Sequence, residues 1–407
     1  MATNLEKHLQ ALVDTKRIPN ASLYACDATG AFSYQSIFGS SAPSPDSPPL
    51  TTDHHLWAAS STKLFVSIAL MRLVEEGHLG LDDTVDALLP ELAALKILTN
   101  TEPPWEYKTP EHRITYRQLL SHTSGLTYYF HHPHLIAWRQ QHPVTQEDVP
   151  HRFNAPLLYE PGTAWAYSCA LDWAGLAVER VAGTTLSDYL GKILEPAGVA
   201  PGDITFFPLT LPDAKIPTMA QRTANGDGEG DGGSEGFVAG DQGIPPLPKT
   251  PDQTFCYGGH GGFVRGDAYL KVLRSLLADD GKLLSPATAA EMLRPQLDAV
   301  QKRSINDGLL YLAPAFERTA ARGVPRGRMD YCLCGNVDVE GQGWGRGRGT
   351  VVMGGAPNIK WFLDREMGLC GFFGAAMLPS GDPTYVDVEV EFEKAVYEMA
   401  GKSSPAS

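Results

Sequence analysis

The sequence predicts an α/β (α+β) protein in which a mainly helical lobe is inserted into a domain of mixed helices and strands. Two observations predict this class. Patterns of both helical and strand period occur near the two ends of the 407-residue chain, whereas the middle is rich in helical patterns and loops. We therefore expect an α/β domain from residues 1–90 and 255–407, a helical lobe from residues 91–254, and a functional site between them.

The N-terminal elements follow from the spacing of apolar residues. Leucines at helical spacing predict a helix over residues 4–16. Residues 22–39 alternate apolar and polar side chains around a turn, which indicates a β-hairpin. From 62 to 76 apolar residues occupy nearly every face, so this helix is expected to be buried on most sides.

The rest of the chain divides in the same way. A low-complexity, Gly- and Asp-rich stretch at 223–243 predicts an acidic loop. Two β-rich runs follow near the C-terminus, at 350–364 and 368–378. The further helical patterns lie at 114–121, 171–181, 185–194, 267–278, 287–293 and 386–399.

Composition excludes several classes of partner. The net charge is −14, and phosphate backbones attract basic surfaces, so nucleic acid is not expected to bind. No apolar run reaches the roughly 18 residues that a membrane span needs. The N-terminal residues carry charges without an apolar core, which is unlike a secretory signal and predicts a cytoplasmic protein. The six cysteines are then expected as thiols.

Ser60 and Lys63 form the strongest local signal. They make an S-x-x-K tetrapeptide at the start of the buried helix, and three residues along a helix is about one turn, so both side chains reach the same side. Burial lowers the pKa of a lysine, so Lys63 is able to hold the serine's proton. The alternative is a solvated serine cap with a surface lysine.

Tyr167 is the second candidate. It follows a Pro-Gly turn and directly precedes a predicted helix. A tyrosine beside a lysine can act as a general base, since the ammonium favours the phenolate. The alternative is a core tyrosine whose hydroxyl is satisfied.

These motifs together resemble the serine β-lactamase-like superfamily, which includes class C β-lactamases, DD-peptidases and family VIII esterases. Within it, the chain is most similar to fungal transesterases of the lovastatin diketide acyltransferase type. The resemblance runs from about residue 5 to residue 400. It is carried by Ser60-x-x-Lys63, Tyr167-Ser168-Cys169 and the segments 119–126, 125–135, 170–190, 257–263, 269–286 and 354–361.

The resemblance implies a central antiparallel sheet flanked by helices, and an acyl transfer in which Ser60 is the nucleophile. Tyr167, helped by Lys63, would take the serine's proton, and the N–H groups of Ser60 and Ala356 would form the oxyanion hole. No cofactor or metal is implied. Tyr128, His132, Tyr257, Gly355 and Trp361 are the candidates for substrate binding.

Two departures from the superfamily bear on the reaction. Cys169 stands where β-lactamases and peptidases have an asparagine, and Met353-Gly354-Gly355-Ala356 stands where they have Lys-Thr-Gly. The missing lysine normally pairs with the substrate's carboxylate, which argues against a β-lactamase. The predicted function is an acyltransferase with a thioester or ester donor and a small-molecule alcohol acceptor, in fungal-type polyketide metabolism. A family VIII-like carboxylesterase and an inactive small-molecule-binding homologue are the alternatives.

Two clusters outside these motifs need an interpretation. His131, His132 and His134 lack a neighbouring carboxylate cluster, so we expect a pocket loop and no metal site. Arginines gather at 318, 322, 326, 328, 346 and 348. Such a cluster is usually a solvated face. The sharper hypothesis is that an acyl carrier protein docks at Arg346 and Arg348.

Overall fold

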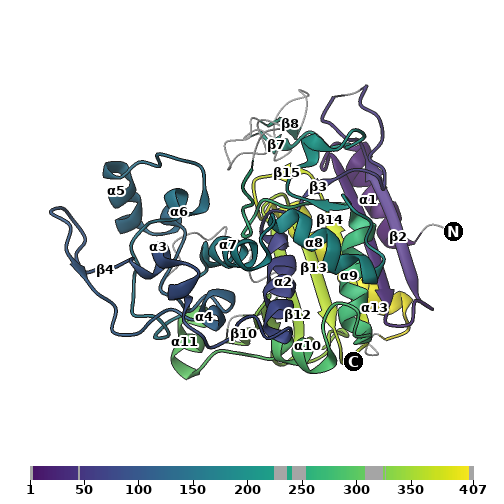
Figure 1. Cartoon of the computed structure of the whole chain (residues 1–407). Helices are drawn as coiled ribbons and strands as arrows, with labels where there is room; N and C mark the ends of the chain where they lie inside the picture. The colour runs from purple at the N-terminus through teal and green to yellow at the C-terminus, as the bar shows by residue number, and fades with distance from the viewer. Residues whose placement is uncertain are drawn as a thin grey trace.

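A seven-stranded antiparallel sheet forms the centre of the larger part of the molecule in the computed structural model, which describes residues 3–44, 46–223, 236–240, 254–307, 324–325 and 327–402. In Figure 1 this sheet lies in the right half of the view. In spatial order its strands are β10 (Met329–Tyr331), β11 (Asn336–Asp338), β12 (Thr350–Gly355), β13 (Ile359–Asp364), β14 (Leu369–Gly374), β1 (Asn20–Asp27) and β2 (Ser33–Gly39).

Both faces of the sheet are covered, as the period of two along its strands requires. Leu23 and Phe362 point to one face, where they pack with α1 (Asn4–Asp14) and α13 (Pro383–Met399). The adjacent residues Tyr24 and Trp361 point to the other face and join the larger core. That face is covered by α9 (Gly266–Ala278), and the same core contains α2 (Lys63–Glu75) and α10 (Pro286–Leu293).

The second part of the molecule is mainly helical and lies beside the sheet in Figure 1. It joins the sheet-containing part through the packing of α7 against α2. Its elements are α3 (Pro90–Ala93), β4 (Ile97–Leu98), β5 (Tyr107–Lys108), α4 (Tyr116–Leu120), α5 (Pro133–Gln141), α6 (Val149–Arg152) and α7 (Ala170–Ala182), and α11 (Ala299–Asp307) packs near it.

Two small three-stranded sheets pair strands that come from different stretches of the chain. One has the order β3-β9-β6 and the other β15-β7-β8. The strands β6 and β7 fall inside the expected lobe 91–254, yet they pair with β9 and β15 of the other part. These elements are β3 (Leu56–Trp57), β6 (Ile204–Thr205), β7 (Ala220–Arg222), β8 (Phe237–Ala239), β9 (Phe263–Val264) and β15 (Met377–Leu378), with α8 (Leu186–Leu194) before β6.

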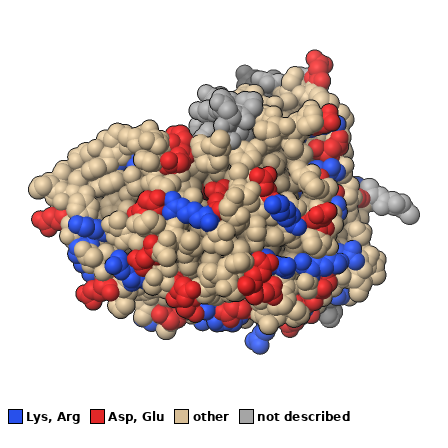
Figure 2. Space-filling view, viewed as in Figure 1, with Lys and Arg blue, Asp and Glu red and all other residues tan. Residues whose placement is uncertain are grey.

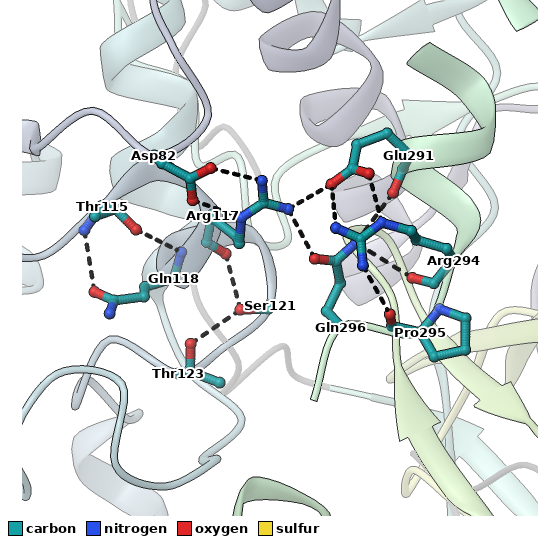
Figure 3. A network of polar contacts seen from close by, with 10 residues as sticks. All are labelled: Asp82, Thr115, Arg117, Gln118, Ser121, Thr123, Glu291, Arg294, Pro295 and Gln296. Carbon is teal, nitrogen blue, oxygen red and sulfur yellow. Dashed lines mark hydrogen bonds and ion pairs between the residues drawn. The ribbon is translucent and has the colours of Figure 1, made fainter. Parts of the chain in front are cut away.

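A polar network ties the two parts together (Figure 3). Arg117 on α4 donates to both oxygens of Asp82 at 2.6 and 2.8 Å, and to Glu291 on α10 at 2.5 Å. Glu291 is held in turn by Arg294. These carboxylates raise the pKa of Arg117, so the guanidinium is permanently charged and spans from α4 to α10.

The expected fold class is confirmed, because the structure combines helices with antiparallel sheets. The expected hairpin is β1 and β2, and the helix expected at 62–76 is α2. Each β-rich run contains two strands, β12 and β13 in the first, β14 and β15 in the second. The helix α11 has no counterpart in the sequence prediction. Most of the predicted acidic loop at 223–243 lies outside the described residues.

Charge and hydropathy of the described surface agree with the composition. On the face seen in Figure 2, acidic and basic side chains are interspersed. Within the described ranges, no helix has both the length and the apolar character that a membrane crossing requires. All six cysteines are free and buried.

Candidate active site

Ser60 lies on a short 3-10 turn, η1 (Ala59–Thr62), directly before α2. The turn is fixed from below, since the Ala58 N–H donates to the Gly262 carbonyl at 2.9 Å. Ala59 has a φ of +44°, a backbone conformation that residues other than glycine rarely adopt. The backbone is therefore strained directly before Ser60. Ser60 is partly exposed while Ala59 and Ser61 are buried, so its hydroxyl is the accessible group of the turn.

Lys63 is fully buried, with 0% of its surface exposed. Its Nζ atom lies 3.4 Å from Ser60 Oγ, 3.3 Å from the Tyr128 hydroxyl and 2.6 Å from the Gly259 carbonyl oxygen. A protonated amine has three N–H groups for these three oxygens. A neutral amine has two N–H groups and a lone pair, which is free to accept the Ser60 proton.

Burial controls the ionisation of this cluster. It lowers the pKa of Lys63 to about 7, and the charge of Asp172 opposes the shift. Burial also raises the pKa of Tyr167, and a hydrogen bond with Ser60 opposes that shift. A buried site disfavours charge on either group, so Lys63 is the easier of the two to hold in the form of a base.

Tyr167 is held at Lys63 by the segment that follows α4. Thr127 Oγ1 donates to the Tyr167 carbonyl at 2.9 Å, and His122 Nδ1 lies 2.8 Å from Ser168 Oγ. The Tyr167 ring then lies under the amine, with Lys63 Nζ 4.6 Å from the ring centroid. The S-x-x-K serine, its lysine and Tyr167 are therefore brought together, as the sequence predicts.

The end of β12 lies against the serine turn. Gly355 is buried, and a Cβ atom there would overlap the Ala58 carbonyl oxygen, so only glycine allows this close approach. Ala356 follows directly, and its side chain packs in the same apolar cluster as Ala59. The segment that replaces Lys-Thr-Gly is thus beside Ser60.

The other predicted pocket residues divide into two groups. Tyr128 contacts Lys63, and His132 is half-buried on the neighbouring turn with its ring 4.8 Å from that of His134. Tyr257 is buried and donates its hydroxyl to Glu147, so it supports the loop at 257–262 from behind. In the parts of the chain that the structure describes, no group of three or more His, Cys, Asp or Glu side chains is arranged for a metal ion.

Two predicted roles are wrong. Trp361 has 0% exposure on β13 and lies in the core beneath α9, because the helix covers that face of the sheet. It cannot line an open pocket. Arg346 is 3% exposed, and its guanidinium donates to Glu393 at 2.7 and 2.6 Å, so it cannot dock a carrier protein. Arg318, Arg322 and Arg326 lie outside the described residues.

Asp172 is the residue that the sequence prediction missed. It lies in the first turn of α7 with 0% exposure, and it accepts a hydrogen bond from the Gly259 N–H at 2.9 Å. Burial raises its pKa to about 6, while Lys63 and Gly259 oppose the shift. An acidic residue in the otherwise apolar run at 170–178 was the available signal.

Comparison with known proteins agrees with this geometry. The family model described as Beta-lactamase matches residues 5–371. The chain belongs to the β-lactamase family. The lovastatin esterase of Penicillium rubens is 34% identical over 97% of this β-lactamase family chain and 98% of its own length. The monacolin J acid methylbutanoyltransferase of Aspergillus terreus is 33% identical over 97% and 95%.

Solved structures place this β-lactamase family member in the same group. The unliganded simvastatin synthase of Aspergillus terreus superposes with a TM-score of 0.86 at 32% identity, covering 97% of each chain. The fold is therefore β-lactamase-like. With acyltransferases and esterases as its relatives, the chain is a serine acyltransferase or esterase of this family, as its sequence predicts.

Proposed function

We propose that this protein is an acyltransferase that moves an acyl group from a thioester or ester donor to an alcohol of a small, polyketide-derived molecule. The observation that supports this most directly is the contact of Lys63 with Ser60, with the Tyr167 ring beneath the amine. A relative named as a methylbutanoyltransferase and another named as a lovastatin esterase support acyl-ester chemistry on such a substrate.

The reaction follows from the ionisation of the cluster. Neutral Lys63 accepts the Ser60 proton across the 3.4 Å contact, and Ser60 Oγ attacks the donor carbonyl. The proton returns to the departing thiol or alcohol through the Tyr167 hydroxyl, which leaves an acyl-Ser60 ester. The acceptor alcohol then loses its proton to the same base, attacks the acyl group, and releases Ser60 with its proton restored.

The oxyanion of each tetrahedral intermediate is assigned to the N–H groups of Ser60 and Ala356. The close approach of Gly355 to Ala58 supports this assignment, since it brings the end of β12 to the serine turn. Removing one donor of an oxyanion hole costs about 10²–10³ in rate. The other predicted contacts, Tyr128 and His132, are assigned to the substrate side.

The second candidate function is hydrolysis of esters, which the lovastatin esterase relative favours. The two functions share Ser60 and differ in whether water or an alcohol attacks the acyl-enzyme. Mass spectrometry of products formed when an acyl thioester and candidate alcohols are supplied together decides between them. Mainly ester product supports the transferase, and mainly free acid supports the esterase.

Substitution of Ser60 by alanine tests the shared nucleophile. The variant is expected to lose all covalent acyl adduct when incubated with a p-nitrophenyl ester, as measured by intact-protein mass spectrometry. An adduct that persists on Ser60→Ala overturns the assignment.

Delivery of the acyl group by an acyl carrier protein is a further part of the proposal. Of the two arginines predicted to dock it, only Arg348 is exposed. It precedes β12, whose six residues span about 20 Å towards Ala356. Charge reversal in Arg348→Glu is expected to slow transfer from a carrier-bound donor more than from a short free thioester. Equal effects on both donors reject this docking site.

A further inference from the structure

Asp172 is linked to Lys63 through two groups that lie between them. The Gly259 N–H donates to Asp172 Oδ1 at 2.9 Å, and the carbonyl of the same residue accepts from Lys63 Nζ at 2.6 Å. The Tyr128 hydroxyl is the second group, 3.3 Å from Lys63 Nζ. One buried carboxylate thus faces the catalytic amine across a single residue of backbone and a phenol.

The space between these groups leaves no room for a side chain. A Cβ atom at Gly259 would overlap Asp172 Oδ2 and lie 2.8 Å from the Tyr128 hydroxyl. Gly259 is buried in the loop at 257–262, whose Gly262 also anchors the serine turn through Ala58. The position of this loop therefore fixes both the Gly259 carbonyl that accepts from Lys63 and the backbone of the turn that carries Ser60.

From this arrangement we infer that Asp172 is the positioning residue of the site: it holds Gly259 beneath Lys63, and its negative charge keeps a proton on the amine between turnovers. The inference rests on the proposed function, in which Lys63 exchanges a proton with Ser60. Burial without a partner would drive the proton off the lysine, and an opposite charge within about 4–6 Å draws it back. The shift in pKa of both groups agrees with this exchange.

Other ionisable groups also face the pair, and the effect of Asp172 has to be measured against them. His260 Nδ1 lies 3.5 Å from Asp172 Oδ1, and the Tyr128 hydroxyl lies 3.3 Å from Lys63 Nζ. Among the described residues the set is Tyr128, His131, His122, Arg152, Tyr167, Cys169, Tyr257 and His260.

Asp172→Asn isolates the charge, because the amide oxygen still accepts from the Gly259 N–H. We expect the acidic limb of kcat/KM for a p-nitrophenyl ester to move to lower pH by about 1–3 units, since Lys63 then loses its proton more easily. The alkaline plateau should change less than about tenfold. A limb that stays at the wild-type pH overturns the inference.

Asp172→Glu is the conservative variant and keeps the experiment decisive if the asparagine variant does not fold. It retains the charge, so the limb should stay near the wild-type pH, while the longer side chain displaces Gly259 and lowers kcat. If the acidic limb of Asp172→Glu moves as far as the one expected for Asp172→Asn, the inference is contradicted. The matched control is Asp364→Asn, since Asp364 is equally buried and accepts hydrogen bonds from the Gly347 N–H and from the hydroxyl of Tyr397 on α13, in the core on the other face of the sheet. Its limb should not move.

The same samples separate this inference from the proposed function. Mass spectrometry locates the acyl group in the wild-type enzyme. An acyl group on a residue other than Ser60 overturns the proposed function. An acyl-Ser60 enzyme whose pH limb is unmoved in Asp172→Asn overturns the role of Asp172 alone.

Discussion

Two lysines are buried equally deeply in this protein and serve opposite purposes. Lys360 on β13 donates directly to Glu393 at 2.6 Å, beside the guanidinium of Arg346. Lys63 on α2 hydrogen-bonds to oxygens of a serine, a tyrosine and a backbone carbonyl, and Asp172 lies beyond that carbonyl's residue, Gly259. The comparison teaches that distance to the counter-charge, more than burial, separates a structural lysine from a reactive one.

The two sites differ in ionisation for the same reason. Around Glu393, Arg346 and Lys360 outweigh the effect of burial and lower the pKa of the acid to about 2, so its carboxylate is ionised at neutral pH. Burial lowers the pKa of Lys360 as well, but Glu393 in direct contact opposes that shift. Around Lys63, burial outweighs Asp172 and lowers the pKa of the lysine to about 7. A proton can therefore leave and return at Lys63 near neutral pH.

Replacing each lysine by methionine should produce the largest contrast. Lys63→Met is expected to reduce kcat/KM at least 10³-fold because the base is lost, with little change in thermal stability. Activity within tenfold of the wild type would remove Lys63 from the proton transfer. The measurement is p-nitrophenyl ester turnover together with thermal unfolding.

Lys360→Met should do the reverse. It leaves Glu393 buried with one partner fewer, and breaking a buried ion pair costs about 3–5 kcal/mol of the free energy of unfolding. The folded fraction should turn over substrate at the wild-type rate. Urea unfolding measures the loss, and a loss below about 1 kcal/mol would show that the pair is not structural.

Gly259→Ala sharpens the comparison by changing the spacer instead of the lysine. The added methyl group would overlap Asp172 and crowd Tyr128, so we expect kcat to fall by about 10–100-fold. Gly191→Ala on α8 is the matched control, because nothing lies within 4 Å of a Cβ there. If both variants keep full activity, the spacing at Gly259 does not matter to catalysis.

The smallest effect is a pH dependence of stability that belongs to the structural site. The folded pKa of Glu393 lies below its ordinary value of 4.5, so its contribution to stability is complete above pH 4.5 and is lost as the pH falls towards 2. Between these values the wild-type protein should lose more free energy of unfolding than Glu393→Gln does. Parallel curves for the two proteins would contradict the shift.

The sequence predicts the local parts of this site better than its distant parts. Ser60 and Lys63 are one helical turn apart, so their contact follows from the helix alone, and Tyr167 was found through a motif. Asp172 is linked to Lys63 through Gly259, which is 87 residues away from it along the chain, and no local pattern predicts that contact.

The burial of Arg346 and Trp361 could not be predicted from the sequence either. The sequence predicts Arg346 as a surface cation, but α13 brings Glu393 to it from 47 residues further along the chain. The sequence predicts Trp361 as a pocket residue, but α9 covers the face of β13 on which it lies. In both cases a helix distant in sequence decides the exposure, and periodicity along one strand carries no information about which helix covers it.

The pairing of β1 with β14 has a consequence for how the protein is made. Ser22 on β1 lies opposite Gly374 on β14. One edge of the first strand therefore stays unpaired until nearly the whole chain has been synthesised. During synthesis, that edge is open to other chains, and long-range pairing of this kind folds slowly. The serine turn is also incomplete until β12 has been synthesised, because Gly355 at the end of β12 packs against Ala58. A nascent chain therefore acquires its nucleophile early and its catalytic competence last.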